Sequence, residues 1–409
     1  YNVYYDDFTS LYPSESRMPL PYGKSEFVES VEIENFFGFV RCMVRTKDTT
    51  RKPIHCVKCK KTKRLLFPII ENWTELTLFS EEIKFGMTQD MYEYRFLDGY
   101  KYKSGYILKY CMEDAVERKA KARAEGKDGL ASVYKTIANS TYGFWALNVH
   151  DRESLIVGRN HEVDILKYLQ EGTLLEINQT ENYTSLKVLA DIEVKDTCIS
   201  IASAITSWSR MRLWSLINDI ESIGGDVYYC DTDSVIHSIN IDEYPDLVTK
   251  YKWDKTGKDL GSLKDESEEA VEKYFTKKIR KQYQYKDTQK TSKEHVDEIK
   301  RLCSLQTNRY FDSGVIGGLK FYSLQKTLHD GSKVEINKLK GGNASSLSHN
   351  DYLTKTCMEQ EQTQFRCGVQ GYLSQDFGIR VGGIQKKFEM QYTKALVQPD
   401  THMLTPLRI

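Results

Sequence analysis

The sequence lacks several features that would define a class of protein at once. Its 409 residues hold no run of 18 apolar residues and no signal peptide, so we expect a soluble, intracellular protein without a membrane span. The net charge is zero, so any contact with nucleic acid must be local. No internal repeat or long low-complexity segment is present. The eight histidines show no arrangement for general-base catalysis.

Cysteine is sparse, with nine residues scattered along the chain, and in an intracellular protein we expect them to stay reduced. One Cys-x-x-Cys pair, Cys56 and Cys59, directly follows His55. A structural zinc ion needs four ligands, and a second Cys-x-x-Cys pair is missing. Cys42 or His55 would have to complete the set. An incidental pair is therefore the favoured interpretation, with zinc as the alternative.

What the chain does have is local charge. The length exceeds one typical domain, and 28% charged with 40% apolar residues is ordinary for a globular protein. Residues 45–64, 118–127 and 273–301 are strongly basic, and the last run is interleaved with aromatic residues. Cations beside aromatic rings suit the binding of a nucleic acid strand. A solvated surface is the alternative for each run.

Two carboxylates stand in a turn between strand-like runs at residues 228–235, Tyr-Tyr-Cys-Asp-Thr-Asp-Ser-Val. A hairpin tip would present Asp231 and Asp233 at a sheet edge. Mg²⁺ prefers one or two carboxylates together with substrate phosphates. The pair therefore points to phosphoryl or nucleotidyl transfer by paired metal ions. The alternative is an ordinary solvated turn.

A further carboxylate stands at the end of a β-rich run at the N-terminus. Residues 1–5 are followed by Asp-Asp-Phe-Thr-Ser-Leu-Tyr-Pro-Ser, in which Asp7 ends the strand and Pro13 stops the pairing. A two-metal site requires bridging ligands from separate elements, and Asp7 meets that need. The alternative is an edge strand followed by a Ser/Pro turn.

A helix is predicted from about residue 130. At 100° per residue, Lys135, Asn139 and Tyr142 fall within about 60° of one another. Tyr and Asn are weak helix formers and unusual on a merely solvated face. The opposite side is apolar and is expected to face the core, with Leu130, Val133, Ile137 and Phe144. The alternative is an ordinary amphipathic helix with a solvated lysine.

Together these motifs resemble those of family B DNA polymerases. Asp-x-x-Ser-Leu-Tyr-Pro-Ser at 7–14 is similar to motif A, Lys-x-x-x-Asn-Ser-x-Tyr-Gly at 135–143 to motif B, and Tyr-x-Asp-Thr-Asp-Ser at 229–234 to motif C. Lys-Phe-Tyr at 320–322 resembles the Lys-x-Tyr motif that meets the primer strand. Leu-Gly-x-x-Lys-x-Glu at 260–266 resembles a palm segment. Any one pattern can arise by chance, whereas the ordered set is specific.

The spacing of the motifs resembles that of the protein-primed branch, which carries insertions called TPR1 and TPR2 between motifs A and B and between B and C. Residues 38–70 and 392–400 are similar to polymerases of Polinton/Maverick elements and adenoviruses. The resemblance implies an α+β right-hand fold with an antiparallel-sheet palm, helical fingers and a thumb. The implied division is palm at 1–37, a TPR1-like insertion at 38–111, fingers at 112–147, a TPR2-like insertion at 148–195, palm at 196–270, and palm end with thumb at 271–409.

The resemblance also implies roles for individual residues. Asp7 and Asp233 would bridge two Mg²⁺ ions, for which Mn²⁺ can substitute, with Asp231 as an auxiliary metal-site acid. Lys135 would neutralise charge on the β/γ-phosphates, and Tyr12 would collide with a 2′-hydroxyl. The full nucleotide site would comprise backbone groups of Phe8, Thr9, Ser10 and Leu11 together with Tyr12, Arg123, Lys135, Asn139 and Tyr142. The residues expected to position primer or template DNA are Ser10, Gly143, Lys320 and Tyr322.

The implied activity is template-directed addition of dNTPs to a DNA primer, or to a protein-primed initiation product, in the replication of a viral, transposon or linear-plasmid DNA. The partners would be primer–template DNA, dNTPs and a terminal protein whose hydroxyl accepts the first nucleotide. The chain begins at motif A without an exonuclease domain or an initiating Met, so we expect a fragment or a processed product. Another palm-type nucleotidyltransferase and a non-catalytic DNA-binding relative are the alternatives, and the presence of every expected acid argues against the second.

Overall fold

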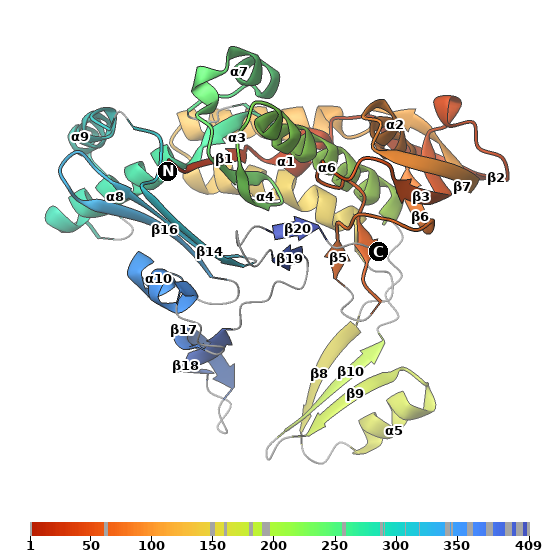
Figure 1. Ribbon diagram of the computed structural model, residues 1–409. Helices are drawn as coiled ribbons and strands as arrows, with labels where there is room; N and C mark the ends of the chain where they lie inside the picture. The colour runs from red at the N-terminus through yellow and green to blue at the C-terminus, as the bar shows by residue number, and fades with distance from the viewer. Residues whose placement is uncertain are drawn as a thin grey trace.

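The computed structural model describes residues 2–60, 64–147, 152–158, 162–179, 183–189, 197–255, 259–286, 289, 291–306, 308–318, 320–339, 344 and 347–357, with strands at 363–373, 379–388, 395–397 and 404–406. These residues form a mixed α+β fold. A long row of elements carries the central sheet, and two smaller units extend away from it, as Figure 1 shows. No helix among these residues is long and apolar enough to cross a membrane.

The central sheet has four strands in the order β11-β12-β1-β13, all antiparallel. They are β1 (Tyr4–Phe8), β11 (Val227–Asp231), β12 (Ser234–His237) and β13 (Leu263–Asp265). Helix α6 (Ile199–Ser222) packs on one face through Leu216, Ile217 and Ile220, which meet Phe8 and Leu11. Burial of each such side chain contributes about 1.5–3 kcal/mol, so this contact fixes β1 against the helix.

A buried ionic network anchors the same strand. The Asp6 carboxylate is fully buried and accepts hydrogen bonds from His237 Nε2 (2.9 Å), Trp253 Nε1 (3.1 Å) and Arg309 Nη2 (3.0 Å). Arg309 also donates from Nε to Asp265 on β13 at 3.1 Å, and its guanidinium lies 4.1 Å over the Trp253 ring. A buried charge is tolerated only when paired and hydrogen-bonded, and here every partner comes from a different segment.

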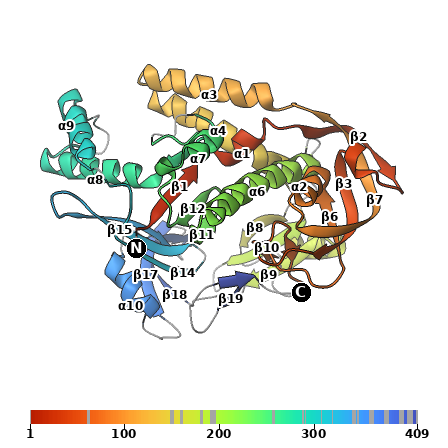
Figure 2. The ribbon, with the colours of Figure 1, turned by 45° about the horizontal axis from the view of Figure 1, so that its top comes forward.

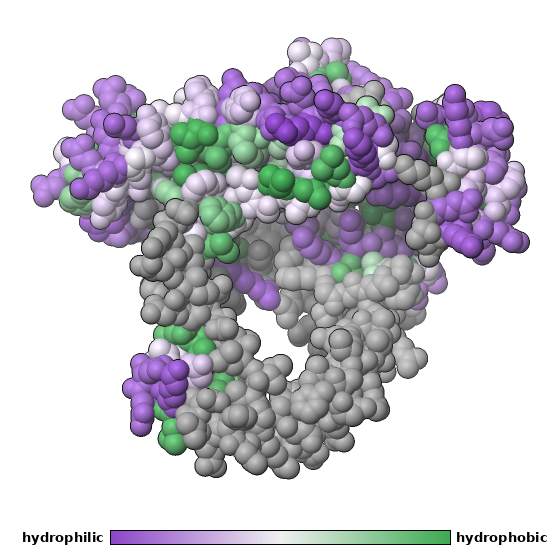
Figure 3. Space-filling model, turned by 180° about the vertical axis from the view of Figure 1, so that it is seen from behind, coloured by the Kyte–Doolittle hydropathy of each residue, from purple (hydrophilic) through white to green (hydrophobic). Residues whose placement is uncertain are grey.

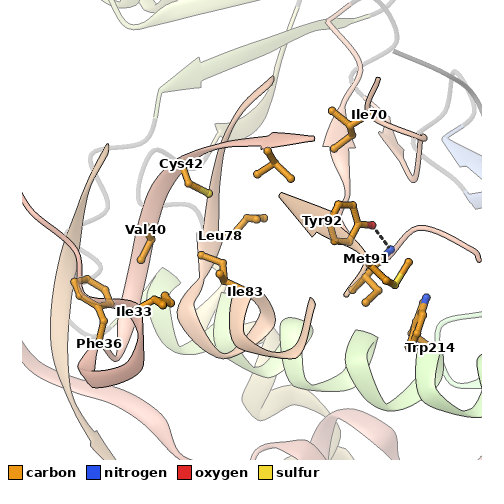
Figure 4. Close-up of a cluster of buried hydrophobic side chains, with 12 residues drawn as sticks. Ile33, Phe36, Val40, Cys42, Ile70, Leu78, Ile83, Met91, Tyr92 and Trp214 are labelled. Carbon is orange, nitrogen blue, oxygen red and sulfur yellow. Dashed lines mark hydrogen bonds between the residues drawn. The ribbon is translucent and has the colours of Figure 1, made fainter. Parts of the chain in front are cut away.

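A second antiparallel sheet has the order β2-β7-β3-β6. Its strands are β2 (Leu20–Val28), β3 (Gly38–Thr46), β6 (Thr74–Phe79) and β7 (Tyr92–Gly105), and helix α2 (Ser80–Thr88) covers it. Alternate β3 residues Val40, Cys42 and Val44 point inward, as the period of a half-buried strand requires. Figure 4 shows this core, into which α6 inserts Trp214. Smaller elements in this part are η1 (Ile33–Asn35), β4 (Val57–Lys58) and β5 (Leu65–Leu66).

A second buried ion pair ties this sheet to α6. Glu82 on α2 accepts from Arg210 Nη2 at 2.7 Å and contacts His55 Nδ1 at 2.9 Å. Burial alone would raise the pKa of Glu82, but Arg210 and His55 outweigh it and lower the pKa to about 2. Helix α6 therefore belongs to both cores and sets how the two sheets lie relative to each other.

Helices α3 (Lys109–Ala124) and α4 (Asp128–Trp145) form an antiparallel pair. The predicted helix is present, but its expected core side is wrong. The pair packs through the fully buried Met112 and through small residues, since Ala115, Ala131 and Ala138 are also buried. The larger apolar side chains of α4 lie outside this contact, between 43% and 52% exposed: Leu130, Val133, Ile137 and Phe144. Figure 3 shows apolar surface among polar residues in the upper half of the molecule.

The second half of the chain adds a helical hairpin and another sheet. Helix α8 (Glu266–Gln282) begins at Asp265, whose side chain accepts the Ser267 N–H, and α9 (Lys293–Ser304) packs beside it. Strands β14 (Ser313–Gly318), β15 (Phe321–Thr327) and β16 (Lys333–Leu339) form an antiparallel sheet next to them. Figure 2 shows the hairpin and this sheet on the same side of the central sheet. The other elements here are η2 (Ile241–Glu243), α7 (Pro245–Tyr251) and α10 (His349–Cys357).

Two units extend below the row in Figure 1. One has strands in the order β8-β10-β9, with β8 (Arg152–Gly158), β9 (Leu174–Gln179), β10 (Tyr183–Leu189) and helix α5 (Glu162–Gln170), in agreement with the strand-like alternation of this stretch. The other contains the hairpin of β17 (Thr363–Leu373) and β18 (Ile379–Phe388). A short pair, β19 (Ala395–Val397) and β20 (Leu404–Pro406), lies nearer the centre.

The buried network predicts an asymmetric effect of mutation. Arg309→Met should destabilise the protein by about 3–5 kcal/mol, because it leaves two buried carboxylates without their cation. Arg41→Met, which removes a solvent-exposed pair with Asp98, should leave stability unchanged within error. Urea unfolding followed by circular dichroism measures both. Equal midpoints for the two variants would contradict the anchoring role of Arg309.

Candidate active site

The candidate site forms where β1 ends. Asp7 lies opposite Ser234 of β12 and Lys264 of β13. The turn before β12 is tight: Thr232 has φ 62°, and the Asp233 N–H meets the Asp231 carbonyl at 2.6 Å. The Asp233 carbonyl in turn accepts the Phe8 N–H at 2.7 Å. Strand register therefore places Asp7 and Asp233 side by side, although 226 positions separate them in the sequence.

The two carboxylates disfavour each other's charge. Burial, reinforced by the negative charge of Asp233, raises the pKa of Asp7 to about 8. Burial, reinforced by Asp231, raises the pKa of Asp233 to about 6. Perturbed acids of this kind cluster at functional sites. A cation placed between them would relieve the repulsion.

The ammonium group of Lys264 neutralises the charge of Asp7 only in part, because other acids share it. Its Nζ is 3.9 Å from Asp7 Oδ1 but is also engaged by Glu269 Oε2 at 2.8 Å and by Glu266. Among the described residues, no group of three or more His, Cys, Asp or Glu side chains is arranged to hold a metal ion. Two carboxylates nevertheless fit Mg²⁺, because this ion takes one or two of them and completes its shell with substrate phosphates and water.

A large cavity of about 1780 Å³ opens over these acids. Asp7 and Asp233 line it from the sheet, and Tyr12 lines it from the short helix α1 (Leu11–Glu15). The helical pair contributes a polar wall of Lys119, Arg123, Lys135 and Asn139. Helices α8 and α9 contribute a further wall of mixed charge, in which three acids of α8 accompany five cations: Lys273, Lys277, Arg280, Lys281 and Lys300, with Glu268, Glu269 and Glu272. The cavity thus joins paired acids to many cations, as a polyanionic ligand that carries metal ions would require.

The cations on the helical pair are close enough to influence one another. Burial lowers the pKa of Lys119, and Arg123 and Lys135 lower it further through repulsion. Lys119 belongs to the basic run at 118–127 but was not singled out from the sequence. Lys119 lies one helical turn before Arg123 on α3, and this spacing is the signal that places both cations on the same face. Lys273, Lys277 and Lys281 on α8 show the same spacing.

The segment between Asp7 and α1 departs from the expected phosphate contacts. The N–H groups of Phe8 and Thr9 are donated to the carbonyls of Asp233 and Ser262, and the Phe8 ring is fully buried. The prediction that backbone groups of these two residues hold phosphates is therefore wrong. Ser10 and Leu11 remain on the cavity wall, where Ser10 has φ 53° and the first turn of α1 leaves N–H groups without intrahelical acceptors.

Gly261 fixes the position of α1. It has φ +77°, and its N–H is donated to the Thr9 carbonyl at 2.8 Å. A Cβ at this position would lie 2.1 Å from Ser14 Oγ, so only glycine allows the close approach.

The two predicted nucleotide-site tyrosines stack on each other. The rings of Tyr12 and Tyr142 lie 4.5 Å apart, with an interplanar angle of 18°. Burial, reinforced by the Tyr142 phenol, raises the pKa of Tyr12. Gly143, the next residue on α4, has open space around its Cα, and its predicted contact with DNA stays a prediction.

Tyr322 is buried beneath β1 and β11, and its hydroxyl shares a 2.9 Å hydrogen bond with the Tyr5 hydroxyl. Its expected role in positioning primer or template DNA stays a prediction. Lys320, by contrast, is exposed, and its Nζ lies 3.3 Å from Asp231 Oδ2.

Two other sequence interpretations can be compared with the described residues. His55 is buried between Glu82 and Tyr94, and Cys56 lies 3.5 Å from the Arg210 guanidinium, so His55 is engaged elsewhere and no third ligand joins Cys56 and Cys59 in this part of the chain. In the basic run at 45–64, four cations pair with acids of the chain itself: Arg45 with Glu93, Lys47 with Asp90, Arg51 with Asp48, and Lys52 with Glu221. Binding of a nucleic acid strand by this run stays a prediction. The thiols of Cys42, Cys56, Cys111, Cys198, Cys230 and Cys303 form no disulfide.

The fold is similar to that of Phi29 DNA polymerase. The structure of that protein complexed with primer-template DNA and incoming nucleotide substrates gives a TM-score of 0.61 at 15% identity, over 95% of this chain and 58% of that one. Its orthorhombic crystal form gives 0.59 at 16% identity, over 96% of this chain and 58% of that one. At this level of identity the likeness concerns the fold.

The sequence matches then identify the family. Residues 1–223 match the family described as DNA polymerase type B, organellar and viral, and the chain belongs to this family. A probable DNA polymerase of Podospora anserina is 26% identical over 297 residues, which are 64% of this chain and 23% of that protein. The chain thus spans less than a quarter of that relative and somewhat more than half of the Phi29 chains.

Because the pKa of Asp7 is raised, replacing this carboxyl by a neutral amide should increase the stability of the fold at high pH. A carboxyl whose folded-state pKa is about 8, against about 3.9 when unfolded, costs nothing near pH 4 and destabilises the fold increasingly as pH rises toward 8. Metal-free Asp7→Asn should therefore melt roughly 2–4 °C above the unmodified protein at pH 8.5, with the difference vanishing toward pH 4.

The measurement is differential scanning fluorimetry in chelator across this pH range. Asp242→Asn, which changes an exposed acid of η2, is the matched control and should shift nothing. An unchanged or lower melting temperature for Asp7→Asn at pH 8.5 would contradict the raised pKa of Asp7.

Proposed function

We propose that this chain carries the polymerisation site of a template-directed DNA polymerase, which adds dNTPs to a DNA primer. One observation carries the proposal: a single cavity brings together side chains of all three motifs, which lie far apart in the sequence. Motif A supplies Asp7 and Tyr12, motif B supplies Lys135 and Asn139, and motif C supplies Asp233. Membership of the type B polymerase family supports it.

Asp7 and Asp233 would hold two Mg²⁺ ions, since they are the paired, mutually repelling acids of the cavity. When bound, the ions would supply activation of the primer 3′-hydroxyl and stabilisation of charge on the triphosphate and the leaving pyrophosphate. Mn²⁺ would substitute because it prefers the same oxygen ligands.

The protein's own residues bind and orient the triphosphate. Lys119, Arg123 and Lys135 form a cation cluster that repels itself, so an anionic triphosphate is favoured there. Charge grows on the phosphates in the transition state, and a fixed ammonium such as that of Lys135 stabilises it. Asn139, exposed on the same wall, would meet the nascent base pair.

The fold supports an assignment of the right-hand parts. The central sheet would be the palm, the α3–α4 pair the fingers, and the α8–α9 hairpin part of the thumb. Phosphates of a primer–template duplex would then lie against the cations of α8 and α9, whose wall faces the acids across the cavity. The sheet of residues 20–105 and the β8–β10 unit would be the two insertions of the protein-primed branch. We further propose that a terminal protein supplies the priming hydroxyl, and that the replicated molecule is a viral, transposon or linear-plasmid DNA.

The direct test of the proposed function is primer extension. With Mg²⁺, dNTPs and a primed single-stranded template, we expect template-dependent extension that falls at least about 1000-fold in Asp233→Asn, because a metal ligand is lost. The control Asp242→Asn should retain full activity. Extension by Asp233→Asn at the normal rate would contradict the placement of the site. Tight primer–template binding without extension would favour a DNA-binding relative, and extension without a template would favour another nucleotidyltransferase.

The position of Tyr12 leads to a separate prediction about selection of the sugar of the incoming nucleotide. Replacing its ring by a smaller side chain should admit a 2′-hydroxyl, so Tyr12→Val should raise the ratio of kcat/KM for rNTP over dNTP by about 100-fold. Tyr110→Val is the matched control, since Tyr110 is 82% exposed on α3. Steady-state incorporation of a single nucleotide measures the ratio. An unchanged ratio in Tyr12→Val would remove the tyrosine from sugar selection.

A further inference from the structure

The three acids of the site do not have equivalent surroundings. Asp7 and Asp233 line the cavity, whereas Asp231 is not among the described residues that line it. Asp231 ends β11, and β12 lies between β11 and β1 in the sheet. Since neighbouring strands are about 4.8 Å apart, the Asp231 backbone stands about 10 Å from that of Asp7.

Both oxygens of Asp231 are already engaged within the protein. Oδ2 lies 3.3 Å from Lys320 Nζ, and Oδ1 accepts a hydrogen bond from the Thr232 hydroxyl at 3.2 Å. The Asp231 side chain is only 20% exposed, so it is a fixed anchor, while that of Lys320 is 53% exposed and reaches solvent.

The backbone of Lys320 is held from the same strand. Its N–H is donated to the Tyr229 hydroxyl at 3.0 Å, and its φ of 51° lies in the left-handed region that costs a non-glycine residue energy. Tyr229 in turn packs against the buried Tyr322 ring, at 5.1 Å between centroids. Main chain and side chain of Lys320 are thus both fastened to β11, two residues apart. A strained conformation persists only where the surroundings over-determine it.

We propose that Asp231 is a positioning residue that holds the Lys320 ammonium in place for a phosphodiester of the primer strand, and that it does not bind the catalytic metal ions. The proposal rests on the proposed polymerase function and assigns the three acids two different tasks. Lys320 keeps an exposed, pre-oriented charge beside the cavity, which lowers the entropic cost of meeting the strand. The aspartates on the cavity wall keep the metal ions.

The ion pair itself is tested without nucleic acid or catalysis. Limited acetylation of the metal-free protein, read by mass spectrometry, should modify Lys320 at least 3-fold faster in Asp231→Asn, because loss of the carboxylate frees the amine. Asp242→Asn, which changes an exposed acid of η2, should leave the rate unchanged, and the exposed Lys333 serves as the internal reference. Equal Lys320 rates in Asp231→Asn and the unmodified protein would overturn the proposal, whether or not the chain polymerises DNA.

The positioning role of Asp231 is tested by measuring KM and kcat separately in primer extension. Asp231→Asn and Lys320→Gln should each raise the KM for primer–template about 10-fold and change kcat less than 3-fold, and the double variant should be no worse than either single one. The exchanged pair, Asp231→Lys with Lys320→Asp, should remain as poor as the singles, since the cation then lies on β11. Additive losses in the double variant, or a normal KM in Lys320→Gln, would overturn the positioning role.

Measurements of metal binding distinguish the acids that bind metal ions from the acid that positions Lys320. In Mn²⁺ titrations followed by electron paramagnetic resonance, Asp231→Asn should bind Mn²⁺ within 2-fold of the unmodified protein, and Asp233→Asn at least 10-fold more weakly. Equal loss in both variants would make Asp231 a metal ligand after all. Absence of extension by the unmodified protein would count against the proposed function, while the acetylation result would still decide whether the ion pair exists.

Discussion

The pairing of β1 in the middle of the central sheet is the constraint on which the site depends. Side chains alternate along a strand, so Asp6 and Asp7 point to opposite faces. Asp6 enters the buried network with His237, Trp253 and Arg309, and Asp7 faces the cavity. A slip of one residue in register would exchange them, placing an unpaired charge inside and removing the acid that the cavity needs. The cost of burying Asp6 without its partners thus holds Asp7 in place.

Helix α6 extends this constraint to the rest of the molecule. It packs on the central sheet through Leu216 and Ile220 and reaches the second core through Trp214. Its Arg210 forms the buried pair with Glu82, which belongs to the helix covering the second sheet. Residues 20–105 and the central sheet therefore share one helix, and a change in one core is felt in the other. The acids of the cavity, meanwhile, repel each other when both are charged, and a proton or a bound cation relieves this repulsion.

Much of the site was predictable because its residues occur in short patterns: Asp7, Lys135 and Asp233 each stand in a motif and meet in one cavity. The parts that failed depend on distant partners. No pattern near Asp6 in the sequence predicts its contact with Arg309, 303 positions later. Likewise, no pattern near Tyr322 predicts that its hydroxyl is bonded to that of Tyr5. Helical periodicity correctly grouped the apolar residues of α4 but could not show that the alanines make the contact. Likewise, charge counting identified the run at 45–64 without revealing that Arg45 and Lys52 pair with acids far away in the sequence, Glu93 and Glu221.

Strand register makes Asp7 and Asp233, two acids far apart in sequence, a pair that we propose binds metal ions. Crystals grown with Mn²⁺, primer–template and a non-hydrolysable dNTP, measured for anomalous scattering, test this metal site most directly. We expect anomalous peaks about 2.1 Å from carboxylate oxygens of both residues, with Asp231 still paired to Lys320. Peaks elsewhere, or a Mn²⁺ ion coordinated by Asp231 in place of Asp7 or Asp233, would contradict it.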